Sequence, residues 1–116
     1  MHIRVEHVEG LSIVHVDGDL LSEGDQSRLS SRVREIVTAG HVQIVIDLYG
    51  VKHVNSCGLG SLVCALTTAR RGGGNLCLAR VNSPVMDLLK ITRLDQVFHV
   101  HQTIADATIE LGTQMK

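Results

Sequence analysis

Aromatic residues are nearly missing from this sequence, which has one tyrosine, one phenylalanine and no tryptophan among 116 residues. Modules that bind single-stranded nucleic acid stack bases on aromatic side chains, so the composition disfavours that class. A basic surface is missing as well, because 11 basic and 12 acidic residues give a formal net charge of −1. We therefore expect neither nucleic acid nor an anionic lipid surface as a partner.

Cysteine is scarce, and its arrangement excludes two further classes. Cys57, Cys64 and Cys77 are odd in number and form no C-x-x-C pair, which argues against a disulfide framework and against a structural zinc site. The N-terminus is charged and alternating, unlike a signal peptide, and no apolar run approaches the roughly 20 residues that span a membrane. We expect a cytoplasmic protein with reduced thiols and no membrane insertion.

The chain does have strand and helix patterns that alternate along a length suited to one domain, residues 1–116. Residues 3–8 alternate apolar and polar, Glu9-Gly10 is typical of a tight turn, and residues 11–18 predict the antiparallel partner strand. The apolar run 42–47 predicts a strand buried on both faces. The remaining predicted elements are helices from Ser22 to Gly40, over 59–71, from Ser83 to Ile91 and from Thr103, and strands 75–81 and 97–100. The order β-β-α-β-α-β-α-β-α predicts an α/β fold with a parallel or mixed sheet.

The segment VNSCGLGSL, residues 54–62, places Asn-Ser-Cys at the start of a helix directly after the central strand. In open α/β sheets, functional residues gather beyond the carboxyl ends of such strands. One interpretation is structural: Asn55 and Ser56 only cap the helix. The other is functional, since a helix N-terminus binds anions and a phosphate of roughly −1.5 to −2 charges on Ser56 could block a docking partner.

The segment DLYGVKHVNSCGLGSLVCALTTARRGGGNLCLA resembles the centre of STAS domains, in particular the anti-sigma factor antagonists. In that family a strand ending in Asp-Leu leads to an Asp-Ser-Ser/Thr-Gly-Leu-Gly loop, and Asp47-Leu48, Ser56 and residues 58–60 match it position by position. VDGDL and the C-terminal segment from Val81 extend the likeness over nearly the whole chain. The resemblance implies a single STAS-like domain, with a mixed central sheet and helices packed mainly on one face.

The resemblance also implies a function. Ser56 would be phosphorylated by an ATP-dependent anti-sigma factor serine kinase, and a serine phosphatase would reset it. The unphosphorylated chain would bind the kinase and free a sigma factor, so the domain itself would have no catalytic activity, no cofactor and no metal. Leu21, Ser22 and His53 would border the contact surface, while Asn55, Cys57, Gly58 and Leu59 would shape the loop around Ser56.

Two positions depart from the family pattern. Asn55 stands where the family usually has aspartate, so the charge beside the serine is missing although asparagine caps a helix equally well. Leu21 stands where the family often has an acidic residue, which makes the partner-facing loop more apolar. Both changes bear on the partner more than on the fold.

Other interpretations of the sequence remain open. A constitutive STAS subunit of a signalling scaffold or transport complex is the main alternative, and an exposed edge strand could pair two copies. A hydrolase is disfavoured, since the residues around Ser56 lack the first glycine of a G-x-S-x-G elbow. A thiol such as Cys57 at a helix start could act as a redox sensor. His99 and His101 share a strand face, but with no third metal ligand evident we expect exposed edge-strand histidines.

Overall fold

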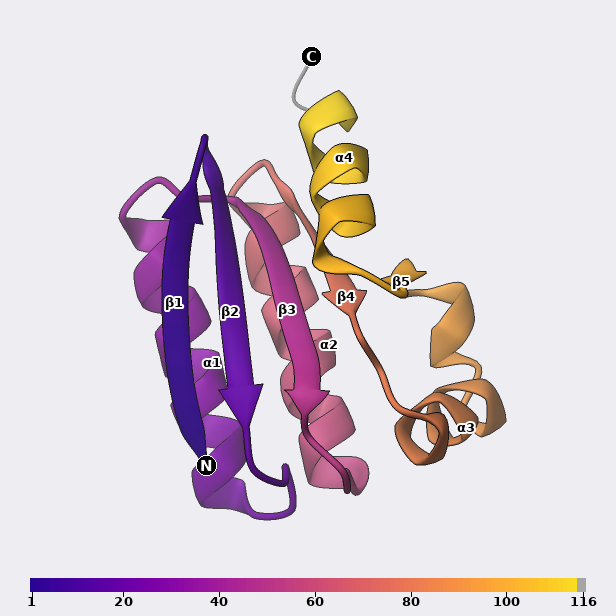
Figure 1. Cartoon of the computed structure of the whole chain (residues 1–116). Helices are drawn as coiled ribbons and strands as arrows, with labels where there is room; N and C mark the ends of the chain where they lie inside the picture. Colours follow the sequence, from indigo (N-terminus) through magenta and orange to yellow (C-terminus); the bar gives the residue numbers. More distant parts are fainter. Residues whose placement is uncertain (115–116) are drawn as a thin grey trace.

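Five strands form one sheet in the order β1-β2-β3-β4-β5 in the computed structural model, which describes residues 1–114 (Figure 1). β1 is antiparallel to β2, and every other neighbouring pair is parallel. The elements are β1 (His2–Val8), β2 (Leu11–Asp17), α1 (Glu23–Thr38), β3 (Gln43–Gly50), α2 (Ser56–Arg71), β4 (Asn75–Ala79), α3 (Ser83–Ile91), the 3-10 turn η1 (Leu94–Gln96), β5 (Val100–His101) and α4 (Ile104–Gln114). The predicted mixed sheet and element order are confirmed.

The β1–β2 hairpin forms where the sequence predicts it. Its two turn residues, Glu9 and Gly10, have φ of 49° and 82°, and positive φ at both positions gives the turn twist that matches the strands. The register then pairs Val8 with Leu11. β1 is the sheet edge and exposes charged and imidazole side chains such as Arg4 and Glu6, which discourage edge-to-edge pairing. A homodimer through this edge stays a prediction.

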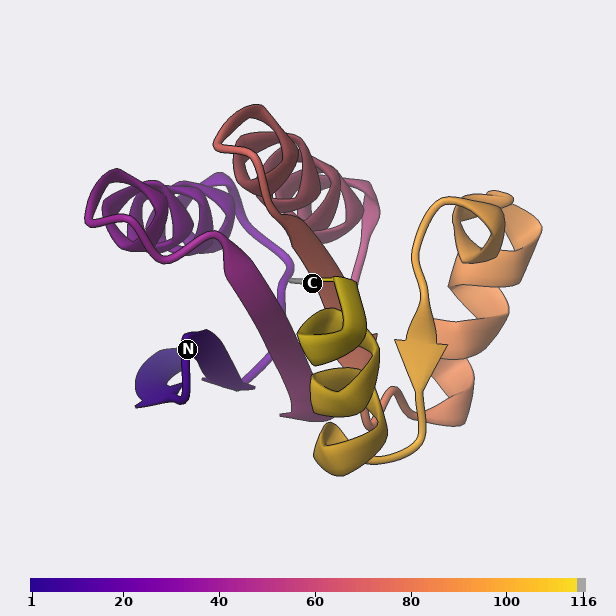
Figure 2. The ribbon, with the colours of Figure 1, turned by 90° about the horizontal axis from the view of Figure 1, so that it is seen from above.

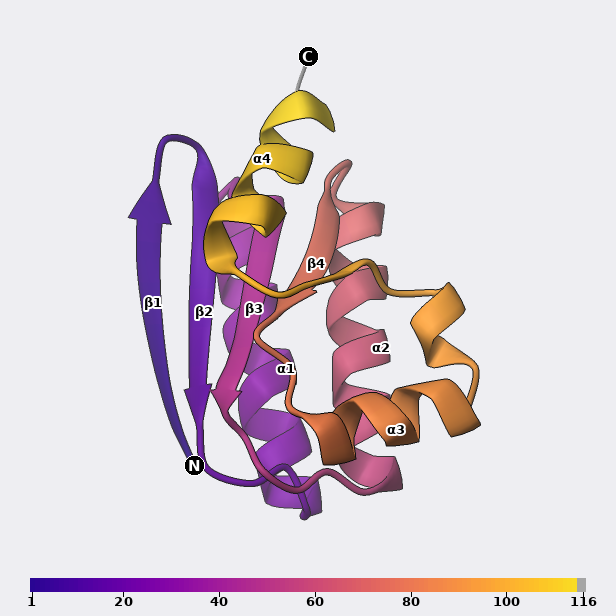
Figure 3. The same cartoon turned by 45° about the vertical axis from the view of Figure 1, so that its right-hand side comes forward.

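The sheet has a core on each face. Helices α1 and α2 cover one face, whereas α4 lies against the other, as the views from above and from the side show (Figures 2 and 3). β3 is buried from Gln43 to Leu48, because both faces cover it. The larger core includes Val14, Leu29, Ile46, Leu62 and Phe98, and the smaller one comprises Leu11, Ile13, Val45, Cys77, Ala79, Ala107 and Leu111. Helices therefore do lie mainly on one face, with α4 as the addition on the other.

Two predicted boundaries after β4 differ from the structure. Asn82, not Ser83, caps α3, since its side chain accepts a hydrogen bond from Val85 N–H. The predicted strand 97–100 is only Val100–His101, because the chain first makes the η1 turn. Thr103 does cap the last helix, accepting from Asp106 N–H at 3.0 Å.

Because β2 and β3 are parallel, the connections that follow them lie at the same end of the molecule. β2 and β3 finish at the same end at which α1 and α2 begin (Figure 1). The connections 18–22 and 51–55 therefore lie side by side there. No helix in the described part of the chain combines the length and the apolar character needed to cross a membrane.

Candidate functional site

Two loops at this end are joined by backbone hydrogen bonds. The segment 18–22 follows β2, and 51–55 follows β3. Leu20 N–H donates to His53 O at 3.1 Å, and Asn55 N–H donates to Leu20 O at 3.3 Å. The pairing of β2 with β3 thus continues past the ends of the strands. It places the segment before α1 directly beside the start of α2.

Asn55 connects the two loops with its side chain. Its Oδ1 accepts from Gly58 N–H at 3.1 Å and so caps α2, while its Nδ2 donates to Leu21 O at 2.7 Å. An aspartate at this position could accept the first bond but has no proton to donate in the second when ionised. The departure from the family pattern therefore adds a link between the loops.

Ser56 is the first residue of α2, and its side chain is exposed. Within residues 1–114 no hydrogen bond or ion pair engages its hydroxyl, and the first turn of α2 carries no acidic side chain. The unpaired N–H groups and the helix dipole give such a helix start a partial positive charge. A negative group on Ser56 would therefore be stabilised in the free protein.

The neighbouring loop presents an apolar side chain beside this serine. Leu21 is 46% exposed, and its backbone is held by Asp25, whose Oδ2 accepts from Leu21 N–H and from Ser22 N–H, each at 3.2 Å. Ser22 in turn caps α1 by accepting from Asp25 N–H at 3.0 Å. The bond from Leu21 N–H is the main cause that lowers the pKa of Asp25. Leu21 and Ser22 thus form a fixed surface.

The remaining predicted residues, in the second loop and the first turn of α2, differ in exposure. His53 is exposed, Cys57 is half-buried, and Leu59 is only 7% exposed and packs into the larger core. Gly58 is buried so closely that a Cβ atom there would lie 2.4 Å from Leu20 O. The structure brings all eight predicted residues to one end. Leu21, Ser22, His53, Asn55 and Ser56 are exposed, while Cys57, Gly58 and Leu59 support them.

A second polar cluster, centred on Asp47, escaped sequence reasoning. Arg80 Nε and Nη2 donate to Asp47 Oδ1 and Oδ2 at 2.9 and 2.5 Å, and His15 Nδ1 lies 2.6 Å from Oδ2. Burial raises the pKa of Asp47, but these hydrogen bonds outweigh it and hold that pKa below its usual value. Arg80 also stacks on Tyr49, 4.6 Å from the ring centroid. Because the charges pair with one another, the cluster braces β2, β3 and the residue that follows β4.

The prediction for the two edge-strand histidines was wrong for His101. Its side chain is only 22% exposed, and Glu110 from α4 lies 3.3 Å from its Nε2. His99 is exposed as expected, at 61%, and pairs with the same glutamate. The acidic partner that sequence reasoning missed, Glu110, lies in α4, 9 and 11 positions after the two histidines, where strand periodicity gives no signal.

The comparisons with known proteins agree with this geometry. A family model for the STAS domain matches residues 2–107. The anti-sigma F factor antagonist of Paenibacillus polymyxa is 25% identical over 112 residues, which are 96% of this chain and 95% of that protein. The crystal structure of an anti-sigma factor antagonist from Mycobacterium paratuberculosis has a TM-score of 0.81 and 25% identity, with 95% of this chain and 92% of that chain covered.

A more distant likeness concerns the fold alone. The phosphorylated form of the Bacillus cell fate determinant SpoIIAA superposes with a TM-score of 0.72 at 12% identity, over 94% of this chain and 98% of that chain. The anti-sigma factor antagonist of Mycobacterium paratuberculosis and this phosphorylated protein thus share one architecture with the present chain.

Proposed function

The chain belongs to the STAS domain family, and we propose that it is an anti-sigma factor antagonist switched by phosphorylation of Ser56. In the unphosphorylated form it binds an anti-sigma factor serine kinase and so frees a sigma factor. The kinase then phosphorylates Ser56 and releases the chain, and a serine phosphatase restores the binding form. The chain carries out no catalysis in this cycle.

One observation carries the proposal: Ser56 is exposed at the start of α2, its hydroxyl has no bond within residues 1–114, and the exposed Leu21 lies on the adjoining loop. A partner that covers Leu21 also covers Ser56, because Asn55 ties the two loops together. A phosphate at the helix start costs the free protein little. In an interface it leaves a charge poorly paired, at about 2–5 kcal/mol, which weakens binding tens- to thousands-fold.

The test is an affinity capture from native lysate in the presence of ADP. Three baits are used: wild type, Ser56→Glu and Ser83→Glu. Ser83 is the matched control, because it is the exposed first residue of α3 and follows a capping asparagine, as Ser56 does. We expect wild type and Ser83→Glu to retain a small ATP-binding kinase, which Ser56→Glu releases.

Addition of ATP to the captured complex supplies the second measurement. We expect phosphate on the peptide that contains Ser56 and release of the chain from the kinase. If all three baits hold the same scaffold or membrane protein and ATP leaves Ser56 unmodified, the switch is refuted and the constitutive subunit is the better description.

A further inference from the structure

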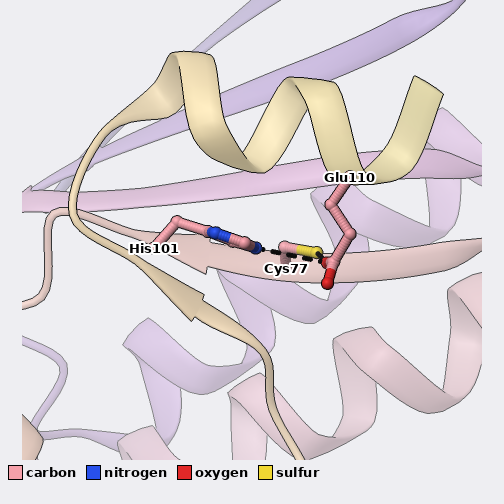
Figure 4. Close-up of side chains that lie close together, drawn as sticks. All are labelled: Cys77, His101 and Glu110. Atoms are coloured by element: carbon pink, nitrogen blue, oxygen red, sulfur yellow. Dashed lines mark hydrogen bonds and ion pairs between the residues drawn. The ribbon is translucent and has the colours of Figure 1, made fainter. Parts of the chain in front are cut away.

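A group of potential metal ligands lies on the opposite face of the sheet from α1 and α2, beneath helix α4 (Figure 4). Cys77 comes from β4, His101 from β5 and Glu110 from α4, and one ligand atom of each lies within 4.8 Å of the other two. Cys77 Sγ donates to Glu110 Oε2 at 2.6 Å. The three side chains therefore converge on one point from three different elements.

A fourth donor stands at the rim of this group. His99 precedes β5 by one residue and shares a strand face with His101, since alternate residues of a strand point the same way. Its Nδ1 lies 2.5 Å from Glu110 Oε1. The cluster thus offers one sulfur, two imidazole nitrogens and a carboxylate, and zinc binds each of these ligand types.

One atom of the cluster is unsatisfied. His101 Nε2 is buried and makes no hydrogen bond in the part of the chain that the structure describes. Glu110 Oε2 lies 3.3 Å away, within ion-pair range, but the geometry does not make a hydrogen bond. A buried polar atom that makes no hydrogen bond destabilises the fold, and a metal ion is a partner that an imidazole nitrogen can take.

The thiol already lies against the carboxylate that would share the metal. Cys77 is fully buried, and its thiol proton is directed at Glu110 Oε2 in a hydrogen bond. A divalent cation would take the place of that proton, which passes to the solvent.

We propose that Cys77, His101 and Glu110 bind a zinc ion, with His99 or a water molecule as the fourth ligand. Zinc bonds of 2.0–2.3 Å place neighbouring ligands about 3.3–3.6 Å apart, so small side-chain rotations suffice. The ion would enter past Glu110 and His99, which are 25% and 61% exposed. It ties α4 to β4 and β5 and has a structural role.

The experiment uses the untagged full-length chain, titrated with Co²⁺ and then with Zn²⁺ in competition. We expect one equivalent of Co²⁺ to produce a thiolate-to-cobalt charge-transfer band, which Zn²⁺ abolishes. Cys77→Ser should eliminate the band. Glu110→Gln, which keeps the side-chain volume at a partly exposed position, should weaken Zn²⁺ binding at least about 10-fold, because even residues that only orient a ligand contribute that much.

Two control variants separate this site from adventitious binding. Cys64→Ser removes an exposed thiol on α2, and His41→Gln disrupts the stacked ring pair of His7 and His41. Both should retain the cobalt band and the full Zn²⁺ affinity. Binding that survives in Glu110→Gln and Cys77→Ser but is lost in either control would overturn the proposal, as would the absence of any thiolate band.

Discussion

Helices α2 and α3 begin with the same two residues in the same geometry. Asn55 and Asn82 each accept from the backbone N–H three residues on, at 3.1 and 3.0 Å. Each also donates to a backbone carbonyl of a neighbouring segment, at 2.7 and 2.6 Å. Ser56 and Ser83 follow, both exposed, and neither first turn contains an acidic side chain.

The two helix starts differ in what lies around them. Asn82 donates to the carbonyl of Val51, whose side chain is fully buried, whereas Asn55 donates to that of Leu21, which is 46% exposed. The third helical position is a valine in α3 and Gly58 in α2. Capping chemistry alone therefore does not distinguish a regulatory serine. An exposed apolar neighbour and a glycine that lets a second loop approach are what set the start of α2 apart.

The largest effect on stability is expected from Gly58→Ala, which removes that close approach. A Cβ atom there would lie 2.4 Å from Leu20 O and 2.6 Å from Val54 Cγ1, so backbone must move. Overpacking of this kind costs about 1–3 kcal/mol. We expect the free energy of unfolding, measured by urea denaturation, to fall by that amount and the two loops to separate.

Gly60→Ala, two residues later in the same helix, is the matched control. Among residues 1–114, the one atom within 4 Å of a Cβ at this position would be Gln26 Nε2, at 3.6 Å. Alanine exceeds glycine in helix propensity by up to about 1 kcal/mol, so this variant should be as stable as wild type or more so. If both variants lost the same free energy of unfolding, the close contact between Gly58 and Leu20 would not explain the effect of Gly58→Ala.

The next effect concerns the capping asparagines. Asn55→Ala and Asn82→Ala each remove a cap and a bond to a neighbouring loop, and each should lower the free energy of unfolding by about 1–2 kcal/mol. The half-buried Asn82 should give the larger loss, since its orphaned acceptor is less hydrated. Thermal unfolding of the two variants checks the order.

Asn55→Asp separates the two bonds at the first of these sites. Aspartate restores the cap on Gly58 N–H but cannot donate to Leu21 O. We therefore expect it to recover part of the stability that Asn55→Ala loses, and not all of it. If Asn55→Asp were as stable as wild type, the hydrogen bond from Asn55 to Leu21 O would contribute nothing to stability. Aspartate, which the family usually has here, would then stabilise the fold as well as asparagine does.

Local patterns in the sequence predict much of this fold. Glu9-Gly10 predicts the β1–β2 hairpin, the apolar run 42–47 predicts the central strand, and Ser22 predicts the start of α1. These features depend only on near neighbours along the chain. The one-residue error at Asn82 has the same origin. Asparagine and serine both cap helices, and only the bond to Val51 O, 31 residues away, favours Asn82.

The sites depend on contacts between distant segments, which local patterns do not reveal. The loop around Ser56 was found from its place after the central strand and from a family motif, yet neither shows the link from Asn55 to Leu21, which spans 34 residues. Cys77 meets Glu110 across 33 residues, with no motif to pair them. Strand periodicity placed His99 and His101 together but said nothing of the helix that packs above them.

The smallest effect tests whether the two helix starts are electrostatically equivalent. Ser56→Glu and Ser83→Glu each add a negative charge to a first turn that has none. Each should therefore raise the free energy of unfolding by about 0.3–1 kcal/mol at low ionic strength, and by less in concentrated salt. Chemical denaturation at two salt concentrations measures both gains. If Ser56→Glu destabilises the free protein while Ser83→Glu does not, a loss of partner binding in the former would reflect damage to the fold. If both variants gained the same stability, a loss of partner binding in Ser56→Glu would come from the added charge in the interface.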